Sequence, residues 1–147
     1  MNEYDEVIIL VADDDPDDQF MIEESFKEAR ITTPLHFVND GEELVAYLKR
    51  QGKYSTLADL PLPGLILLDL NMPRMDGREV LKELKADPDW RRIPVIVFTT
   101  SQTEGDITRM YDLGVNSFIT KPATFEGLVK IIDTLIQYWL EVVELPV

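Results

Sequence analysis

The sequence predicts an α/β fold: a single doubly wound, five-stranded parallel sheet with helices on both faces. Short runs of consecutive apolar residues, without polar alternation, are typical of parallel strands buried on both faces. Segments with helical apolar spacing follow these runs, so that strand and helix alternate five times along the chain. Acidic, hydroxyl and lysine side chains follow the ends of the runs, where open α/β sheets place their chemistry.

The first strand is expected at residues 7–11, a continuous apolar run that leads into an acidic segment. Asp15 suits the N-cap of the next helix and Pro16 suits its first position. This helix should extend to about residue 29, because Phe20 and Phe26 continue its apolar spacing.

A second, shorter strand is expected at residues 35–38, and we interpret its His36 as a structural residue. The turn at 39–41 leads into a helix at 42–50. Residues 51–64 contain two prolines and end in a glycine, so they predict a long surface loop.

The second half of the chain repeats the alternation of strand and helix. A third strand should end at Asp69, because Pro73 lies close behind it and cannot continue a strand. Gly114 is the expected left-handed cap of the fourth helix. The remaining strands are expected at 65–68, 94–98 and 117–120, and the helices at about 78–85, 104–113 and 125–142.

Composition restricts the class of protein. The 147 residues suit one domain, with a core at about 6–141 and a C-terminal extension at about 142–147. A net charge of −14 and a pI near 4.3 argue against nucleic acid or an anionic membrane as partner, and agree with a divalent cation or a basic protein surface. The absence of cysteine excludes disulfides and thiolate metal sites.

Export and membrane insertion are not indicated. No apolar run approaches the ~20 residues that span a bilayer. Glu3, Asp5 and Glu6 stand where a signal peptide would carry positive charge. We therefore expect a soluble protein in the cytoplasm.

Side chains that can take part in a reaction follow four of the predicted strands: the pair Asp13 and Asp14, then Asp69, Thr99 and Lys121. The carboxyl ends of parallel strands share one edge of the sheet, so these groups should converge. Clustered carboxylates repel one another unless a cation balances them, and Mg²⁺ with its preference for oxygen ligands is the natural choice. A carboxylate beside Mg²⁺, an ammonium group and a hydroxyl is a set of groups suited to phosphoryl transfer.

Four motifs at these positions resemble the receiver domains of two-component response regulators, over nearly the whole chain. Each motif is weak alone and the combination is specific. The motifs are residues 9–16, residues 68–73 with Asp76 and Gly77, residues 98–101, and residues 117–122. The resemblance implies a flavodoxin-like receiver fold.

The resemblance also implies a role for each site residue. Asp69 would be the phosphoacceptor, Thr99 the switch hydroxyl, Phe118 the switch aromatic residue and Lys121 the phosphate-contacting lysine. The Mg²⁺ ion would be held by Asp69 and Asp14 directly, by the backbone carbonyl of Asn71, and by Asp13 through water. Lys121 and Pro122 would be joined by a cis peptide bond. Thr100 is bulkier than the alanine usual after the switch hydroxyl, which leaves the dephosphorylation rate open.

The loop at 51–64 and the tail from Trp139 onward are similar to a subgroup, the single-domain regulators paired with bacterial phytochrome histidine kinases. This resemblance implies a phosphorelay with a sensor histidine kinase, of the bacteriophytochrome kind. With no DNA-binding output domain expected, phosphorylation should switch protein–protein contacts. The protein would assist its own phosphorylation without being a multiple-turnover enzyme.

The last helix allows two interpretations. Its apolar residues either form one broad core-facing surface or include a self-complementary patch that makes a homodimer through the fourth helix, fifth strand and fifth helix. We expect the dimer. The core stripe would comprise Phe125, Leu128, Ile132, Leu135, Ile136 and Trp139, and the patch would include Ile131, Tyr138 and Val142.

Two other functions compete. A phosphatase of the haloacid dehalogenase type would use Asp13, since residues 13–15 contain an Asp-x-Asp after a strand, but the late acidic pair of such enzymes is absent. A flavodoxin-like binding module would need a glycine-rich phosphate loop after the first strand, where this chain has acids.

Overall fold

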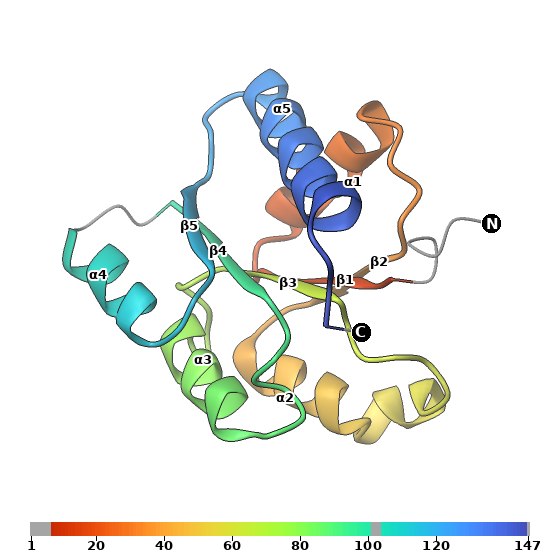
Figure 1. Cartoon of the computed structure of the whole chain (residues 1–147), viewed down its shortest axis with the longest axis vertical. Helices are drawn as coiled ribbons and strands as arrows, with labels where there is room; N and C mark the ends of the chain where they lie inside the picture. Colours follow the sequence, from red (N-terminus) through yellow and green to blue (C-terminus); the bar gives the residue numbers. More distant parts are fainter. Residues whose placement is uncertain (1–6, 101–103, 147) are drawn as a thin grey trace.

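The computed structural model describes residues 7–100 and 104–146, and confirms the predicted fold class (Figure 1). Five parallel strands form one sheet in the order β2-β1-β3-β4-β5. The strands are β1 (Ile9–Ala12), β2 (Leu35–Val38), β3 (Leu65–Leu68), β4 (Val95–Thr99) and β5 (Ser117–Thr120). The α-helices are α1 (Pro16–Glu28), α2 (Gly41–Lys49), α3 (Gly77–Ala86), α4 (Glu104–Asp112) and α5 (Phe125–Ile136).

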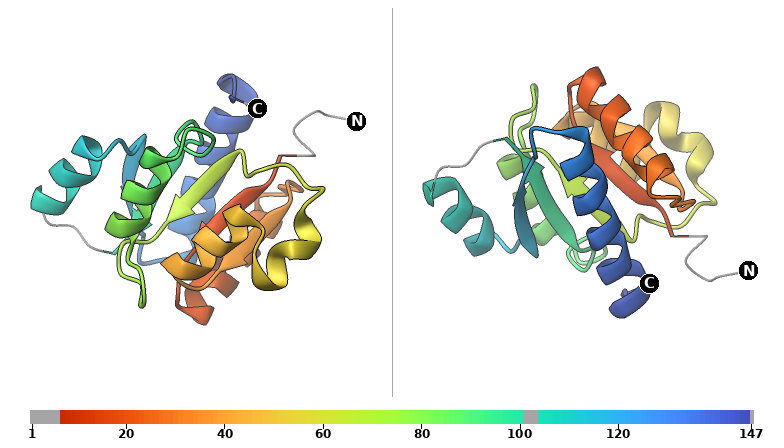
Figure 2. Two further views of the ribbon diagram at one scale, coloured as in Figure 1. Left: turned by 90° about the horizontal axis from the view of Figure 1, so that it is seen from below. Right: turned by 90° about the horizontal axis from the view of Figure 1, so that it is seen from above.

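Helices cover both faces of the sheet, with α1 and α5 side by side on one face and α2, α3 and α4 on the other (Figure 2). Successive strand residues point to opposite faces. Ile9 and Val11 of β1 therefore belong to the core beneath α1 and α5, whereas Leu10 and Ala12 belong to the core beneath α2 and α3. This burial on both sides explains why the strands read as continuous apolar runs.

The helix ends follow the predicted capping signals. The side chain of Asp15 accepts a hydrogen bond from the backbone N–H of Asp17, and Pro16 begins α1. Gly114 adopts the left-handed conformation with φ of 100°, just after α4. His36 of β2 contacts the Tyr47 hydroxyl of α2 at 2.7 Å, which agrees with its structural interpretation.

Two segments differ from the expected pattern. The predicted surface loop contains a short 3₁₀ helix, η2 (Gly52–Leu57), whose Tyr54 and Leu57 pack against the core. The predicted last helix continues beyond α5 as a π-helical turn, η3 (Gln137–Val142). None of the helices in the described part of the chain is both long and apolar enough to cross a membrane.

The predicted cis peptide bond between Lys121 and Pro122 is wrong, because no peptide bond among the described residues is cis. The trans form is intrinsically preferred before proline, by about 0.5–1 kcal/mol. The backbone N–H of Lys121 donates to the carbonyl of Thr99 at 2.9 Å, which continues the pairing of β5 with β4.

Candidate functional site

Backbone pairing that continues beyond the strands places the site residues. The N–H of Asp13 donates to the carbonyl of Val38 at 3.1 Å, and the N–H of Asp69 donates to that of Ala12 at 3.0 Å. Since Ala12 is in register with Leu68, Asp13 and Asp69 follow at neighbouring places on the same edge. The parallel register thus brings together residues that are far apart in the sequence.

Asp69 lies at the centre of this edge, with 8% of its surface exposed. The hydroxyl of Thr99, which is fully buried, donates to Asp69 Oδ1 at 2.7 Å. The ammonium group of Lys121 donates to Asp69 Oδ2 at 3.1 Å, and the N–H of Asn71 donates to Oδ1 at 3.3 Å. One carboxylate therefore accepts hydrogen bonds from a hydroxyl, an ammonium group and a backbone amide. Thr100, which follows Thr99 in the sequence, is exposed.

Lys121 reaches across the edge to two further carboxylates. Its Nζ donates to Asp13 Oδ2 at 2.6 Å and to Asp18 Oδ2 at 2.9 Å. Burial alone would lower the pKa of Lys121, but the hydrogen bonds to these two carboxylates and the charges of Asp13 and Asp69 outweigh it and raise that pKa. The lysine is therefore held in its charged form.

Asp13, Asp14 and Asp69 form the acidic cluster, in which one carboxylate oxygen of each residue lies within 4.8 Å of those of the others. Asp13 and Asp69 are buried, whereas Asp14 is exposed. Burial raises the pKa of Asp13, and this effect outweighs the hydrogen bonds from Lys121 and from the Asp15 backbone N–H, which lower the pKa. An oxygen-only donor set of this charge suits a hard divalent cation, so the residues present fit the predicted metal.

Two residues around the site were not predicted from the sequence. Asp18 of α1 contacts Lys121, and Gln19 Nε2 donates to the backbone carbonyl of Asp13 at 2.6 Å and to Asn39 at 2.8 Å. The sequence places Asp18 in the first turn of α1, but no motif or spacing shows that its side chain reaches Lys121.

Phe118 lies in β5, three residues before Lys121. Its partly buried side chain packs against the core cluster beneath α2 and α3. Its backbone N–H donates to the hydroxyl of Tyr111 in α4 at 3.2 Å, which links β5 to α4. Ser101, the last residue of the third motif, lies outside the described residues.

Comparison with known proteins identifies the class. The family model described as the response regulator receiver domain matches residues 9–133. The chain therefore belongs to the receiver domain family of response regulators, which are signalling proteins of two-component systems. It is 42% identical over 139 residues to the response regulator Rcp1 of Synechocystis sp., an alignment that covers 95% of this chain and 92% of that protein.

Solved structures agree. The phosphorylated cyanobacterial phytochrome response regulator RcpA matches with a TM-score of 0.87 at 41% identity, covering 96% of this chain and 99% of that one. The Mn(2+)-bound form of Rcp1 matches with a TM-score of 0.85 at 42% identity, with the same coverage. No finding favours the phosphatase alternative based on Asp13, and the hydroxyl of Thr99 is directed at Asp69.

Proposed function

We propose that Asp69 accepts a phosphoryl group from the phosphohistidine of a sensor histidine kinase, in a Mg²⁺-dependent cytoplasmic phosphorelay. The observation that carries this proposal is the position of the Asp69 carboxylate, between the Thr99 hydroxyl at 2.7 Å and the Lys121 ammonium group at 3.1 Å. The acidic cluster lies directly beside it. In phosphoryl transfer, the carboxylate is the nucleophile, and the hydroxyl, the ammonium group and a metal ion at the acidic cluster stabilise charge on the phosphoryl oxygens.

The step is an in-line displacement at phosphorus. An oxygen of Asp69 forms the new P–O bond, and the P–N bond to the kinase histidine breaks. The electron pair of that bond stays on the imidazole nitrogen, so the kinase histidine is regenerated. The ammonium group of Lys121 balances charge on the phosphoryl oxygens.

Asp14 and Asp69 would hold Mg²⁺ directly, with the backbone carbonyl of Asn71, and Asp13 would act through a water molecule. When bound, the ion neutralises charge on the transferring phosphoryl group. In the phosphorylated protein, the Thr99 hydroxyl donates to a phosphoryl oxygen and moves inward. Phe118 then follows into the vacated space, and the face made by α4, β5 and α5 changes its partners, as a population shift between two packings.

The relatives suggest the partner. RcpA is by name a cyanobacterial phytochrome response regulator, so we propose a bacteriophytochrome kinase as the phosphoryl donor. The whole chain, residues 1–147, would act as one receiver domain. It would take up and release one phosphoryl group without being a multiple-turnover enzyme.

Replacing the acceptor tests the proposal. Acetyl phosphate with Mg²⁺ should add one phosphoryl mass to the wild-type protein, because Asp69 displaces acetate from the donor. Asp69→Asn should abolish this gain in intact-protein mass spectrometry. The control, Asp89→Asn, alters an exposed aspartate of the α3–β4 connection and should leave the gain unchanged. An equal gain in Asp69→Asn would refute the assignment.

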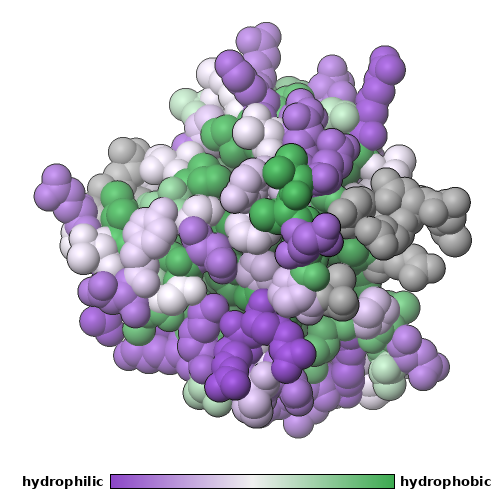
Figure 3. All heavy atoms as spheres, in the orientation of Figure 1, coloured by the Kyte–Doolittle hydropathy of each residue, from purple (hydrophilic) through white to green (hydrophobic). Residues whose placement is uncertain are grey.

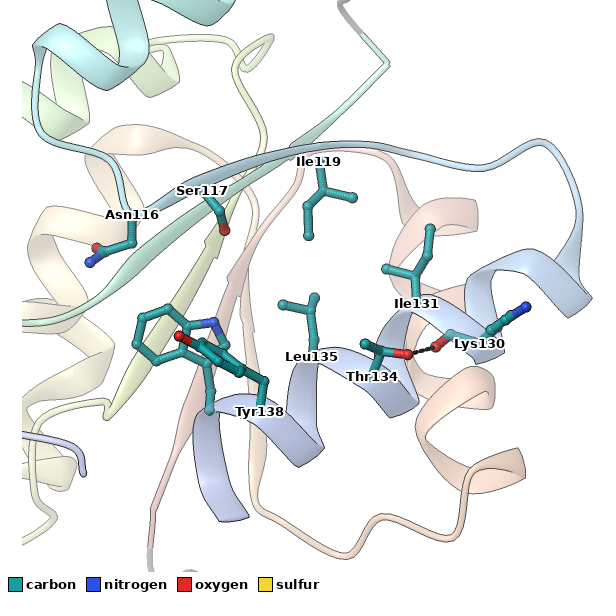
Figure 4. Close-up of a pocket in the computed structure, with 9 residues that line it drawn as sticks. Asn116, Ser117, Ile119, Lys130, Ile131, Thr134, Leu135 and Tyr138 are labelled. Carbon is teal, nitrogen blue, oxygen red and sulfur yellow. Dashed lines mark hydrogen bonds between the residues drawn. The ribbon is translucent and has the colours of Figure 1, made fainter. Parts of the chain in front are cut away.

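The α4-β5-α5 face offers a surface for a homodimer. A mostly apolar groove of about 730 Å³ lies between β5 and α5. In Figure 4, its residues Ile119 and Leu135 point toward one another. Tyr138 is 52% exposed and lies edge-to-face on Trp139, with ring centroids 5.5 Å apart. Figure 3 shows exposed hydrophobic side chains in this region. The predicted core stripe is buried at Leu128, Ile132, Leu135 and Ile136.

Charge at this groove should therefore break the proposed dimer. Tyr138→Glu places a carboxylate on the apolar surface, which is costly to bury without a partner, and should shift sedimentation velocity toward the monomer. Phe20→Glu is the control, because Phe20 is 60% exposed on α1, away from the groove. Circular dichroism should show that both variants remain folded. A sedimentation coefficient unchanged by Tyr138→Glu would rule out this interface.

A further inference from the structure

The hydrogen-bonding capacity of Lys121 is fully used. An ammonium group has three N–H donors, and three carboxylates accept from Nζ: Asp13 at 2.6 Å, Asp18 at 2.9 Å and Asp69 at 3.1 Å. A phosphoryl oxygen can bind this ammonium group only if one of the three carboxylates releases it. The choice of that carboxylate affects how readily Asp69 is phosphorylated.

The three carboxylates differ in how easily each can release the ammonium group of Lys121. The Asp13 side chain is 2% exposed and also accepts from the backbone N–H of Asp15 at 3.0 Å. Asp69 is the acceptor itself, so its contact moves with the phosphoryl group. The Asp18 side chain is 39% exposed, so water can solvate its carboxylate once the lysine leaves. Releasing Asp18 is therefore the least costly exchange.

The surroundings leave room for this exchange. Asp18 and Lys121 line a cavity of about 160 Å³ between α1 and the β5–α5 connection. Because the Asp18 side chain is also 39% exposed, its carboxylate has access to solvent when it releases the lysine.

We propose that Asp18 is a positioning residue that acts through Lys121, by occupying the N–H that a phosphoryl oxygen takes during transfer. The Asp18 carboxylate competes with the incoming phosphoryl group and slows phosphorylation of Asp69. It also keeps the lysine charge balanced before the donor arrives. This inference rests on the proposed phosphorylation of Asp69 and adds a residue that controls its rate.

The chain contains a matched control one residue away. Asp17 lies in the same first turn of α1, carries the same charge and is exposed. Its side chain makes no hydrogen bond or ion pair with the residues that the structure describes. Asp17→Asn and Asp18→Asn thus remove the same charge from the same helical turn, and only the second removes a carboxylate that accepts from Lys121.

The test measures the initial rate of phosphorylation by acetyl phosphate with Mg²⁺, at donor concentrations below saturation, by mass spectrometry. We expect Asp18→Asn to raise this rate about fivefold, since it removes a charge-assisted competitor for the ammonium group. Asp17→Asn should change it less than about twofold, because only screened, exposed charge is removed. Asp18→Glu retains a carboxylate at this position, so its rate should stay within about twofold of the wild-type rate.

The outcomes separate the two claims. If wild-type protein is phosphorylated on Asp69 but Asp18→Asn is no faster, the inference about Asp18 fails and the proposed function stands. An equal acceleration by Asp17→Asn, or by Asp18→Glu, also overturns it, because the effect would then not depend on the contact with Lys121. Lack of any phosphoryl uptake by the wild-type protein refutes the proposed function itself.

Discussion

At the scale of single residues, the site depends on how closely backbones approach one another. Gly77 begins α3 directly against the end of β3, and its N–H donates to the carbonyl of Leu70 at 3.0 Å. A Cβ atom at this position would lie 2.6 Å from the backbone oxygen of Asp69 and 2.9 Å from Leu70 Cα. The absence of a side chain at residue 77 thus allows α3 to pack beside Asp69.

Gly77→Ala should destabilise the protein by about 2 kcal/mol, because the backbone around Asp69 must shift to admit the methyl group. Phosphorylation by acetyl phosphate should slow in the same variant. Gly105→Ala is the control in α4, where a Cβ meets nothing within 4 Å, and should stabilise by about 0.5–1 kcal/mol as alanine favours a helix. Urea unfolding measures both. Equal stabilities of Gly77→Ala and the wild-type protein would show that this close approach is not needed.

The residues at strand ends could be predicted because topology alone brings them together. Asp13, Asp69, Thr99 and Lys121 each follow or end a recognisable apolar run. Asp18 and Gln19 could not be assigned in the same way, because their contacts depend on how far side chains reach across the edge. The isomer of the bond before Pro122 is likewise not readable from local sequence.

At the scale of elements, an ion pair between the buried Asp40 and the exposed Arg74 joins α2 to the loop that follows Asp69. Asp40, which is 4% exposed, caps α2 by accepting from the N–H of Glu43 at 2.8 Å. Arg74, in the β3–α3 loop, donates through Nε to Asp40 Oδ2 at 2.9 Å, and its Nη2 lies 2.7 Å from the same oxygen as an ion pair. The start of α2 is thereby connected to the loop that carries Asn71.

Stability should depend on the charge of Asp40. Burial alone would raise the pKa of this carboxyl group, but the hydrogen bonds from the Glu43 backbone N–H and from Arg74 outweigh burial and lower the pKa below its ordinary value. Folding therefore favours the carboxylate, and its contribution is present above the ordinary carboxyl pKa and lost as pH falls through the lowered value.

Asp40→Asn should accordingly destabilise the protein at pH 7 by about 1–3 kcal/mol. The difference from the wild type should narrow as the pH falls below about 4, because the wild-type carboxylate becomes protonated. Urea unfolding at several pH values measures this difference, with Asp59→Asn in the exposed part of the long loop as control. A difference independent of pH would contradict the role of the charge.

At the scale of the whole molecule, the order β2-β1-β3-β4-β5 explains how an acidic chain forms a compact charged site. β1 and β3 are neighbours, so the aspartates after them meet, while β4 and β5 bring the hydroxyl and the lysine from the other side. Continuous apolar runs predict this sheet, since only burial on both faces tolerates them. The π-helical turn after α5 and the short helix η2 have no comparable periodic signal.

The central claim is that these remote residues create one reactive carboxylate at position 69. Borohydride reduces an aspartyl phosphate to homoserine, so reducing the phosphorylated protein and sequencing its peptides by mass spectrometry locates the modified residue. We predict that Asp69 is converted to homoserine and that Asp13, Asp14 and Asp18 remain aspartate. Conversion of Asp13 or Asp14, or of no aspartate in a protein that had gained the phosphoryl mass, would contradict the assignment.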